Sequence, residues 1–124
     1  MNFRVWDSVA KKMMKWEDVM HLPAWEIFPG TPEQRAYTVM YSTDKTDIDG
    51  KEVFEGDIIE NPDGIRMEIH FGTYQAWCPA DKCYMDSVGF YAEAPELPQM
   101  PIGSLEEYAK VVGNIFENTE LMHS

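Results

Sequence analysis

The sequence is short of cysteine and of basic residues, and it has no long apolar run. Two cysteines in 124 residues are too few for a disulfide scaffold, and no stretch of about 18 apolar residues is present to cross a bilayer. No internal repeat or low-complexity tract occurs, which excludes a solenoid and a disordered tail. With 44% hydrophobic and 13% aromatic residues, the chain can instead furnish the core of a single domain over residues 1–124.

The charge of the chain is strongly one-sided. Ten Lys and Arg stand against 22 Asp and Glu, which gives a formal net charge of −12. A protein that binds nucleic acid normally presents a basic face to the phosphates, so this charge opposes nucleic-acid binding. Two interpretations of the acidic surface remain open: it keeps the protein dispersed in solution, or it docks a basic partner.

The N-terminal residues do not have the pattern of a signal peptide, because Arg4 and Asp7 interrupt any apolar segment there. We therefore expect a cytoplasmic protein that does not enter a membrane. In that compartment Cys78 and Cys83 are expected to be reduced thiols, whereas a disulfide between them would require an oxidising environment.

Strand signals dominate the chain. Residues 1–20 predict an N-terminal hairpin, with an amphipathic helix over 9–20 as the alternative. Prolines predict loops at 21–35 and 93–103. Residues 36–41, 51–54 and 58–60 have the composition of strands, and the polar segment that follows the first of them is expected to turn and to reverse at Gly50.

The strongest local prediction is a hairpin over residues 58–71. Residues 61–64 read Asn-Pro-Asp-Gly, which suits a type I turn, and the next seven residues alternate between apolar and polar. The alternation places Ile65, Met67, Ile69 and Phe71 on one face and His70 on the solvated one. Gly72-Thr73 is then expected to turn the chain before further short strands within 74–92.

A capping-box pattern from Ser104 to Glu107 predicts one short helix near residues 104–109, and a last strand follows over 110–116. The fold class is therefore mainly β, a β-rich α+β domain. It is expected to contain a small, strongly bent antiparallel sheet or a partly open barrel, because a closing sheet hides the edges of short strands.

Sequence signals for catalysis and for metal binding are weak. The loop 45–56 fails as a calcium loop because Lys45 and Gly56 occupy positions that need carboxylates. His70, Cys78 and Cys83 lack a fourth ligand for zinc. No nucleophile elbow or phosphate-binding loop is present. We therefore predict no catalytic residue, no metal site and no cofactor. A small metal-dependent hydrolase that uses acidic residues near 44–57 remains the alternative, and a nucleic-acid-associated barrel protein is the second.

The aromatic residues are the best candidates for binding. Trp and Tyr are favoured anchors of protein interfaces, and the chain has more of them than a small core needs. Trp25, Tyr74 and Trp77 are the residues predicted to form an interaction surface.

Three strings of the sequence together resemble the YopX family, whose members are encoded chiefly by bacteriophages and prophages. They are residues 3–13, residues 49–59, which read DGKEVFEGDII, and residues 111–121, which read VVGNIFENTEL. The motif positions within them are Gly50, Val53, Phe54, Glu55, Gly56, Asp57, Ile58, Gly113 and Asn114. Read as residues, they also suit turns and core positions.

The resemblance implies a compact β-rich domain and a phage product that acts inside the bacterial host, and it assigns no catalytic residues. Together with the failed search for catalytic motifs, it predicts a non-catalytic protein-binding or assembly module. The partner is a host or phage protein or a second copy in a homo-oligomer.

Overall fold

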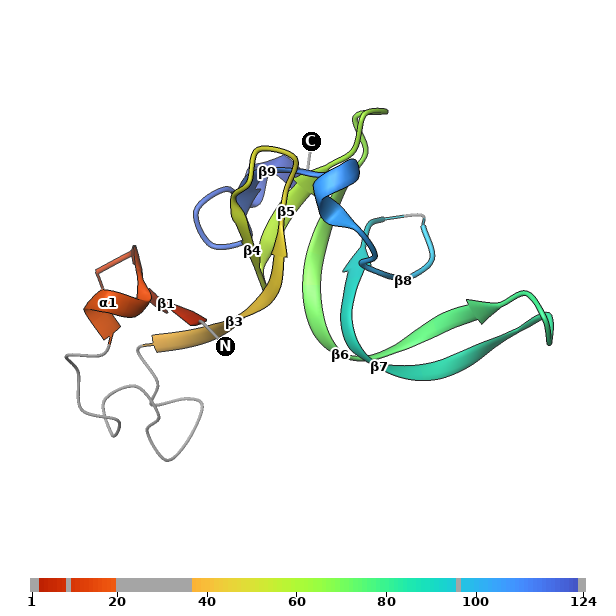
Figure 1. Ribbon diagram of the computed structural model, residues 1–124. Helices are drawn as coiled ribbons and strands as arrows, with labels where there is room; N and C mark the ends of the chain where they lie inside the picture. The colour runs from red at the N-terminus through yellow and green to blue at the C-terminus, as the bar shows by residue number, and fades with distance from the viewer. Residues whose placement is uncertain (1–2, 9, 20–36, 96, 123–124) are drawn as a thin grey trace.

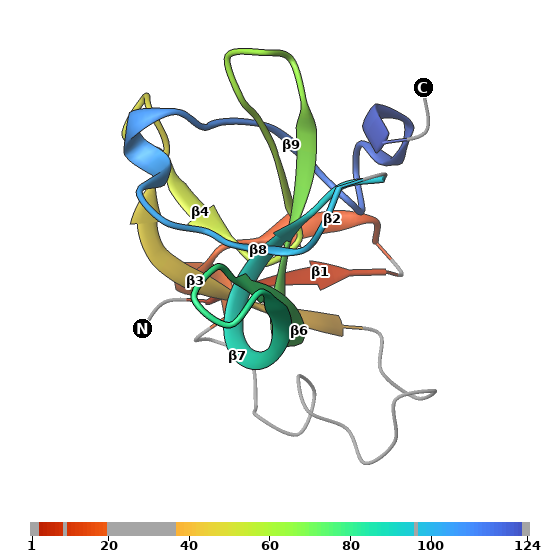
Figure 2. The ribbon, with the colours of Figure 1, turned by 90° about the vertical axis from the view of Figure 1, so that its right-hand side faces the viewer.

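The chain forms two antiparallel sheets that curl into a half-barrel (Figures 1 and 2). This computed structural model describes residues 3–8, 10–19, 37–95 and 97–122, so the predicted loop 21–35 lies outside the described residues. The first sheet has the order β2-β1-β3-β4 and the second β8-β7-β6-β5-β9. The strands are β1 (Phe3–Asp7), β2 (Lys12–Met14), β3 (Tyr37–Thr46), β4 (Glu52–Phe54), β5 (Asp57–Glu60), β6 (Arg66–Cys78), β7 (Cys83–Glu93), β8 (Met100–Pro101) and β9 (Lys110–Asn114).

The N-terminal hairpin is present. β1 pairs with β2 in the register Val5↔Met14, and on its other side with β3. A single helical turn, α1 (Trp16–Val19), follows the hairpin, so a small part of the segment also adopts the alternative helical conformation. Within the described residues, no helix has the length and apolarity that a membrane span requires.

The polar segment after residue 41 was expected to turn and to reverse at Gly50. The reversal is confirmed by the bond from the Gly50 N–H to the Asp47 carbonyl oxygen at 3.0 Å, but the turn expected over residues 42–46 is wrong. β3 continues to Thr46, with a register shift against β4 between Ser42 and Thr46. The Thr43 hydroxyl donates to the Val53 carbonyl oxygen at 2.8 Å and accepts from the Lys45 N–H at 3.2 Å. These bonds of the Thr43 hydroxyl satisfy backbone groups that the irregular pairing of β3 with β4 leaves without a hydrogen bond. A polar sequence can therefore continue as a strand.

The turn predicted at Gly72-Thr73 is also absent. β6 runs on through these residues, and Gly72 pairs directly with Gly89 of β7. Both glycines have a φ near +153°, a backbone conformation that residues with a side chain rarely adopt. β6 and β7 bend sharply together along their length while their pairing continues (Figure 1). Beyond the bend, residues 73–88 form a two-stranded hairpin, here called the arm, which extends away from the rest of the chain (Figure 1).

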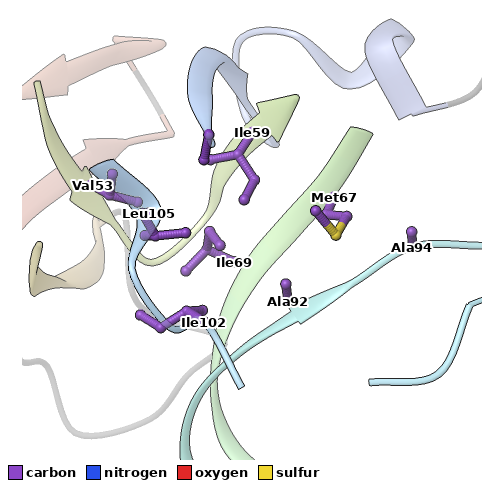
Figure 3. Close-up of a cluster of buried hydrophobic side chains, with 9 residues drawn as sticks. Val53, Ile59, Met67, Ile69, Ala92, Ala94, Ile102 and Leu105 are labelled. Carbon is purple, nitrogen blue, oxygen red and sulfur yellow. The ribbon is translucent and has the colours of Figure 1, made fainter. Parts of the chain in front are cut away.

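The main core lies where the second sheet curls over itself (Figure 3). Its buried side chains come from β4 to β7 and from the segment before β9: Val53, Ile59, Met67, Ile69, Ala92, Ala94, Ile102, Leu105 and Ala109. Of the face predicted for β6, Met67 and Ile69 are buried, while Ile65 and Phe71 at its two ends are exposed. The Asn61–Gly64 turn of the predicted hairpin is confirmed by the bond from the Gly64 N–H to the Asn61 carbonyl oxygen at 2.9 Å.

The short helix expected near residues 104–109 is a 3₁₀ turn, η2 (Leu105–Glu107). The Ser104 side chain makes no capping hydrogen bond, so the capping-box interpretation is wrong in its detail. Buried Leu105 anchors the turn to the core instead. A second 3₁₀ turn, η3 (Thr119–Met122), ends the described chain, and the predicted loop 93–103 contains the two-residue strand β8.

Candidate functional site

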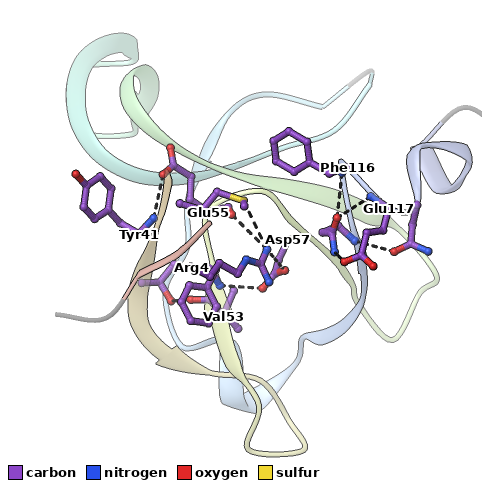
Figure 4. A network of polar contacts seen from close by, with 12 residues as sticks. Arg4, Tyr41, Val53, Glu55, Asp57, Phe116 and Glu117 are labelled. Atoms are coloured by element: carbon purple, nitrogen blue, oxygen red, sulfur yellow. Dashed lines mark hydrogen bonds and ion pairs between the residues drawn. The ribbon is translucent and has the colours of Figure 1, made fainter. Parts of the chain in front are cut away.

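The three strings that carry the family resemblance meet at one junction between the two sheets (Figure 4). β5 pairs with β9, so that Asp57 lies opposite Asn114 and Ile58 opposite Gly113. From the N-terminal string, the Arg4 guanidinium reaches Asp57. Residues about 50 positions apart in sequence therefore form a single structural unit.

A buried ion pair lies at the centre of this junction. Nη2 of Arg4 donates to Oδ1 of Asp57 at 2.6 Å, and the Phe54 N–H donates to Oδ2 at 2.8 Å. The guanidinium also lies 4.8 Å from the centre of the Phe54 ring. Burial raises the pKa of Asp57 and outweighs the opposing effect of Arg4. Because the Asp57 side chain is only 1% exposed, both of its oxygens serve the junction and none faces solvent.

Gly56 and Glu55 connect the strands on either side of the ion pair. Gly56 has a φ of +87°, and its N–H donates to the Ile69 carbonyl oxygen at 2.7 Å. Glycine is required for this backbone conformation, and a Cβ at this position would also crowd Sδ of Met40 at 3.0 Å. Oε1 of Glu55 accepts from the Tyr41 N–H at 3.2 Å.

The C-terminal string is a tight turn held by side chains. Oδ1 of Asn114 accepts from the N–H groups of Phe116 and Glu117 at 3.0 and 2.8 Å. A Cβ on Gly113 would lie 2.6 Å from Oδ1 of Asn118, so the turn closes only over glycine. The remaining motif positions are also structural, since Val53 and Ile58 are fully buried and Gly50 has a φ of +82° in the turn before β4.

The acidic loop, which was the alternative candidate for a hydrolytic metal site, is organised by Asp47. Its Oδ1 accepts from the N–H groups of Asp49 and Lys51 at 2.9 and 2.8 Å, and its Oδ2 accepts from the Val111 N–H at 3.0 Å. Burial opposes the charged form, but the three N–H donors and Lys51 outweigh it and lower the pKa of Asp47. This carboxylate ties the loop to β9.

The other candidate ligands are not brought together. Nε2 of His70 lies 3.0 Å from Oε2 of Glu68 on the half-buried outer face of β6, and the cysteines lie at the tip of the arm. Eight residues of strand, roughly 26 Å of extended chain, separate His70 from Cys78. No group of three His, Cys, Asp or Glu residues within the described parts of the chain is placed to hold a metal ion. Both cysteines are free and lie opposite each other in register.

A hollow of about 320 Å³ lies between the N-terminal hairpin and β4. Its lining is part apolar, from Phe3, Met13 and Phe54, and part charged of both signs, from Lys15, Glu17, Lys51 and Glu52. Arg4, which also lines it, is already engaged by Asp57.

The arm carries the most exposed apolar side chains of the second sheet. From the base of the arm outward, the alternation of β6 and its register with β7 place eight residues on one face, here called the open face: Phe71, Thr73, Gln75, Trp77, Tyr84, Asp86, Val88 and the half-buried Phe90. The exposed fractions are 51% for Phe71, 51% for Trp77, 54% for Tyr84 and 76% for Val88. The rings of Trp77 and Tyr84 contact each other edge-to-face at 5.1 Å.

The open face is bordered by an uncharged groove. Segment 98–101 folds beside the arm, where Oε1 of Gln99 accepts from the Gln75 N–H at 3.1 Å. The groove has a volume of about 670 Å³ and is lined by Trp77, Tyr84, Pro98, Gln99, Met100 and Pro101. Apolar, aromatic walls without charge suit an apolar contact rather than an ionic one.

Of the three residues predicted to form an interaction surface, Trp77 lies on the open face. Tyr74 is only 8% exposed, because it points to the opposite face of β6 and stacks on Tyr91 at 5.0 Å. Trp25 lies outside the described residues. Sequence reasoning missed Tyr84 and Val88, because a turn was expected at residue 72. Continuing the alternation past Gly72 would have placed them opposite Trp77 and Thr73.

A half-barrel of two antiparallel sheets with a projecting arm is the class of structure that this chain defines. The sequence matches the family described as YopX protein over residues 2–123, and the chain belongs to the YopX family. Its fold is similar to that in the crystal structure of protein EF1440 from Enterococcus faecalis, with a TM-score of 0.63 and 20% identity. The alignment covers 98% of this chain and 96% of the other. No curated protein matches the sequence.

Proposed function

We propose that this protein is a non-catalytic protein-binding or assembly module of a bacteriophage or prophage, which acts in the cytoplasm of the bacterial host. The open face of the arm is its contact surface. The contact surface is thus one continuous face of the arm, in place of the separate aromatic residues that the sequence suggested.

One observation carries the proposal: within the described parts of the chain, the core-facing side of the sheet continues onto the arm, where segment 98–101 lies beside it and leaves its apolar side chains largely exposed. Met67 and Ile69 are buried on this side of β6, whereas Phe71 and Trp77, further along the same side, are half exposed. An isolated two-stranded ribbon is at best marginally stable in water. A second surface packed on the arm would remove its apolar side chains from water and stabilise it.

The roles of the buried carboxylates support a non-catalytic function. Asp47 and Asp57 are the most buried acidic side chains that the structure describes, and backbone amides and Arg4 occupy their oxygens. Neither presents a free oxygen to a metal ion or to a reacting water.

The experiment is site-specific photocrosslinking in infected or lysogenic cells. A benzophenone amino acid replaces Tyr84 on the open face or, as the control, Tyr41, an exposed tyrosine on β3. We expect a discrete adduct from position 84 only. The crosslinked protein, once identified by mass spectrometry and purified, should bind the wild-type chain and bind Trp77→Ala at least about tenfold more weakly. Equal adducts from both positions would refute the proposal, and so would equal affinity of the partner for the wild-type chain and for Trp77→Ala.

A further inference from the structure

We infer that the open face of the arm binds the same face of a second copy of this chain, so that two arms pack face to face about a twofold axis. This inference rests on the proposed function, because it names the partner of the same surface.

The chemistry of the open face selects an apolar partner. Asp86 is its single charged residue, and the Gln75 side-chain amide already donates to that carboxylate. The chain has a net charge of −12, so its many other carboxylates would attract a basic partner to other parts of the surface. The open face itself offers such a partner no carboxylate without a hydrogen-bond partner. A second open face offers matching aromatic and aliphatic groups, and its one carboxylate, that of Asp86, already accepts the Gln75 amide.

The shape of the molecule allows two acidic copies to approach. The arm extends beyond the curled sheets (Figure 1), so packed arms keep the two bodies apart. At physiological ionic strength the Debye length is about 8 Å, so repulsion between separated bodies is largely screened. Two flat faces of a strand pair can stack at about 10 Å, the usual spacing of packed sheets. A twofold axis makes the contact self-complementary and closed, which limits it to a dimer.

The size of the face sets the strength of the contact. A large aromatic side chain has about 150–250 Å² to bury, so the four exposed apolar residues, at half exposure or more, contribute on the order of 400 Å² for each copy. This lies below the roughly 800 Å² per partner of a stable interface. The dimer is therefore weak and reversible, and its dissociation constant is expected in the range of about 10 µM to 1 mM.

Sedimentation equilibrium of the purified full chain across this range tests the inference. The average mass should rise from 14.3 kDa toward twice that value with concentration. Val88→Lys and Val88→Glu place a like charge on both copies, so each should raise the dissociation constant at least about tenfold. Met85→Lys is the matched control, since Met85 is 49% exposed on the opposite face of the same arm and should leave the dimer unchanged.

Salt separates self-association from binding to a cationic partner. Raising NaCl from low to physiological ionic strength should strengthen the dimer, because screening reduces the repulsion between two chains of net charge −12. A mass that stays at 14.3 kDa up to 1 mM, or a dimer that Met85→Lys disrupts and Val88→Lys does not, would overturn the inference. A monomer that still gives the Trp77-dependent partner from the Tyr84 crosslink would refute self-association alone, whereas a monomer without that partner would refute the proposed function as well.

Discussion

Replacing Asp47 by Asn tests whether the acidic loop serves structure. The carboxylate accepts three backbone N–H groups, two on Oδ1 and one on Oδ2. Asn retains one acceptor oxygen, but its NH₂ group would face the Val111 N–H. The variant then loses a charge-assisted hydrogen bond and leaves a buried donor unpaired. Such a bond contributes about 1.5–3 kcal/mol, so we expect the free energy of unfolding to fall by about 2–4 kcal/mol.

The effect of this substitution should depend on pH in a defined direction. The folded-state pKa of Asp47 is lowered below the ordinary value of 3.8 for an aspartate, so the charged carboxylate stabilises the fold above that pH. This contribution is lost as the pH falls below 3.8 through the folded-state pKa. The difference in unfolding free energy between wild type and Asp47→Asn should therefore be complete above about pH 5 and shrink in more acidic solution.

Urea denaturation between pH 3 and pH 7 measures both quantities. Asp49→Asn is the control, because it removes the same charge from an exposed neighbour and should change stability by less than about 0.5 kcal/mol. An Asp47→Asn chain as stable as the wild type at pH 7 would refute the structural role. Stabilisation of the wild type, but not of this variant, by Mg²⁺ or Mn²⁺ would instead favour the hydrolase alternative.

Two further substitutions address the junction between the sheets, each measured by urea denaturation at pH 7. Asp57→Ala should destabilise the protein by about 3–5 kcal/mol, since it leaves the Arg4 guanidinium buried without its partner; a loss under 1 kcal/mol would contradict the buried pair. Gly56→Ala should cost about 1–3 kcal/mol through its φ of +87° and its approach to Met40; an unchanged midpoint would contradict that geometry.

The parts of the fold that follow local rules could be predicted from the sequence. The N-terminal hairpin and the Asn61–Gly64 turn depend on alternation and turn residues within a few positions, and the structure has both. The bent antiparallel sheet was predicted from the number of short strands, and its pairings join residues as distant as Asp57 and Asn114. The segment 42–46 was mispredicted because Thr43 bonds the backbone of a strand ten residues away. A propensity rule cannot anticipate such a contact.

The candidate contact surface could be predicted only in part. Trp77 was selected by residue type, but Tyr74, of the same class, is buried against Tyr91, and local sequence does not distinguish the two environments. The arm depends on Gly72 pairing with Gly89, so that glycine bends a continuing strand where it was expected to end one. That pairing spans 17 residues and follows from the register of the whole hairpin.

Hydrogen exchange measured by mass spectrometry, in dilute and in concentrated protein, tests the central claim most directly: that the core-facing side of the sheet continues onto the arm as an exposed contact surface. In dilute solution we expect the arm amides at 73–78 and 83–88 to exchange much faster than those of β5 and of β6 before the bend. They should gain protection as concentration rises and the second copy covers them. Arm amides as protected in dilute solution as those of β5, with no dependence on concentration, would contradict the claim.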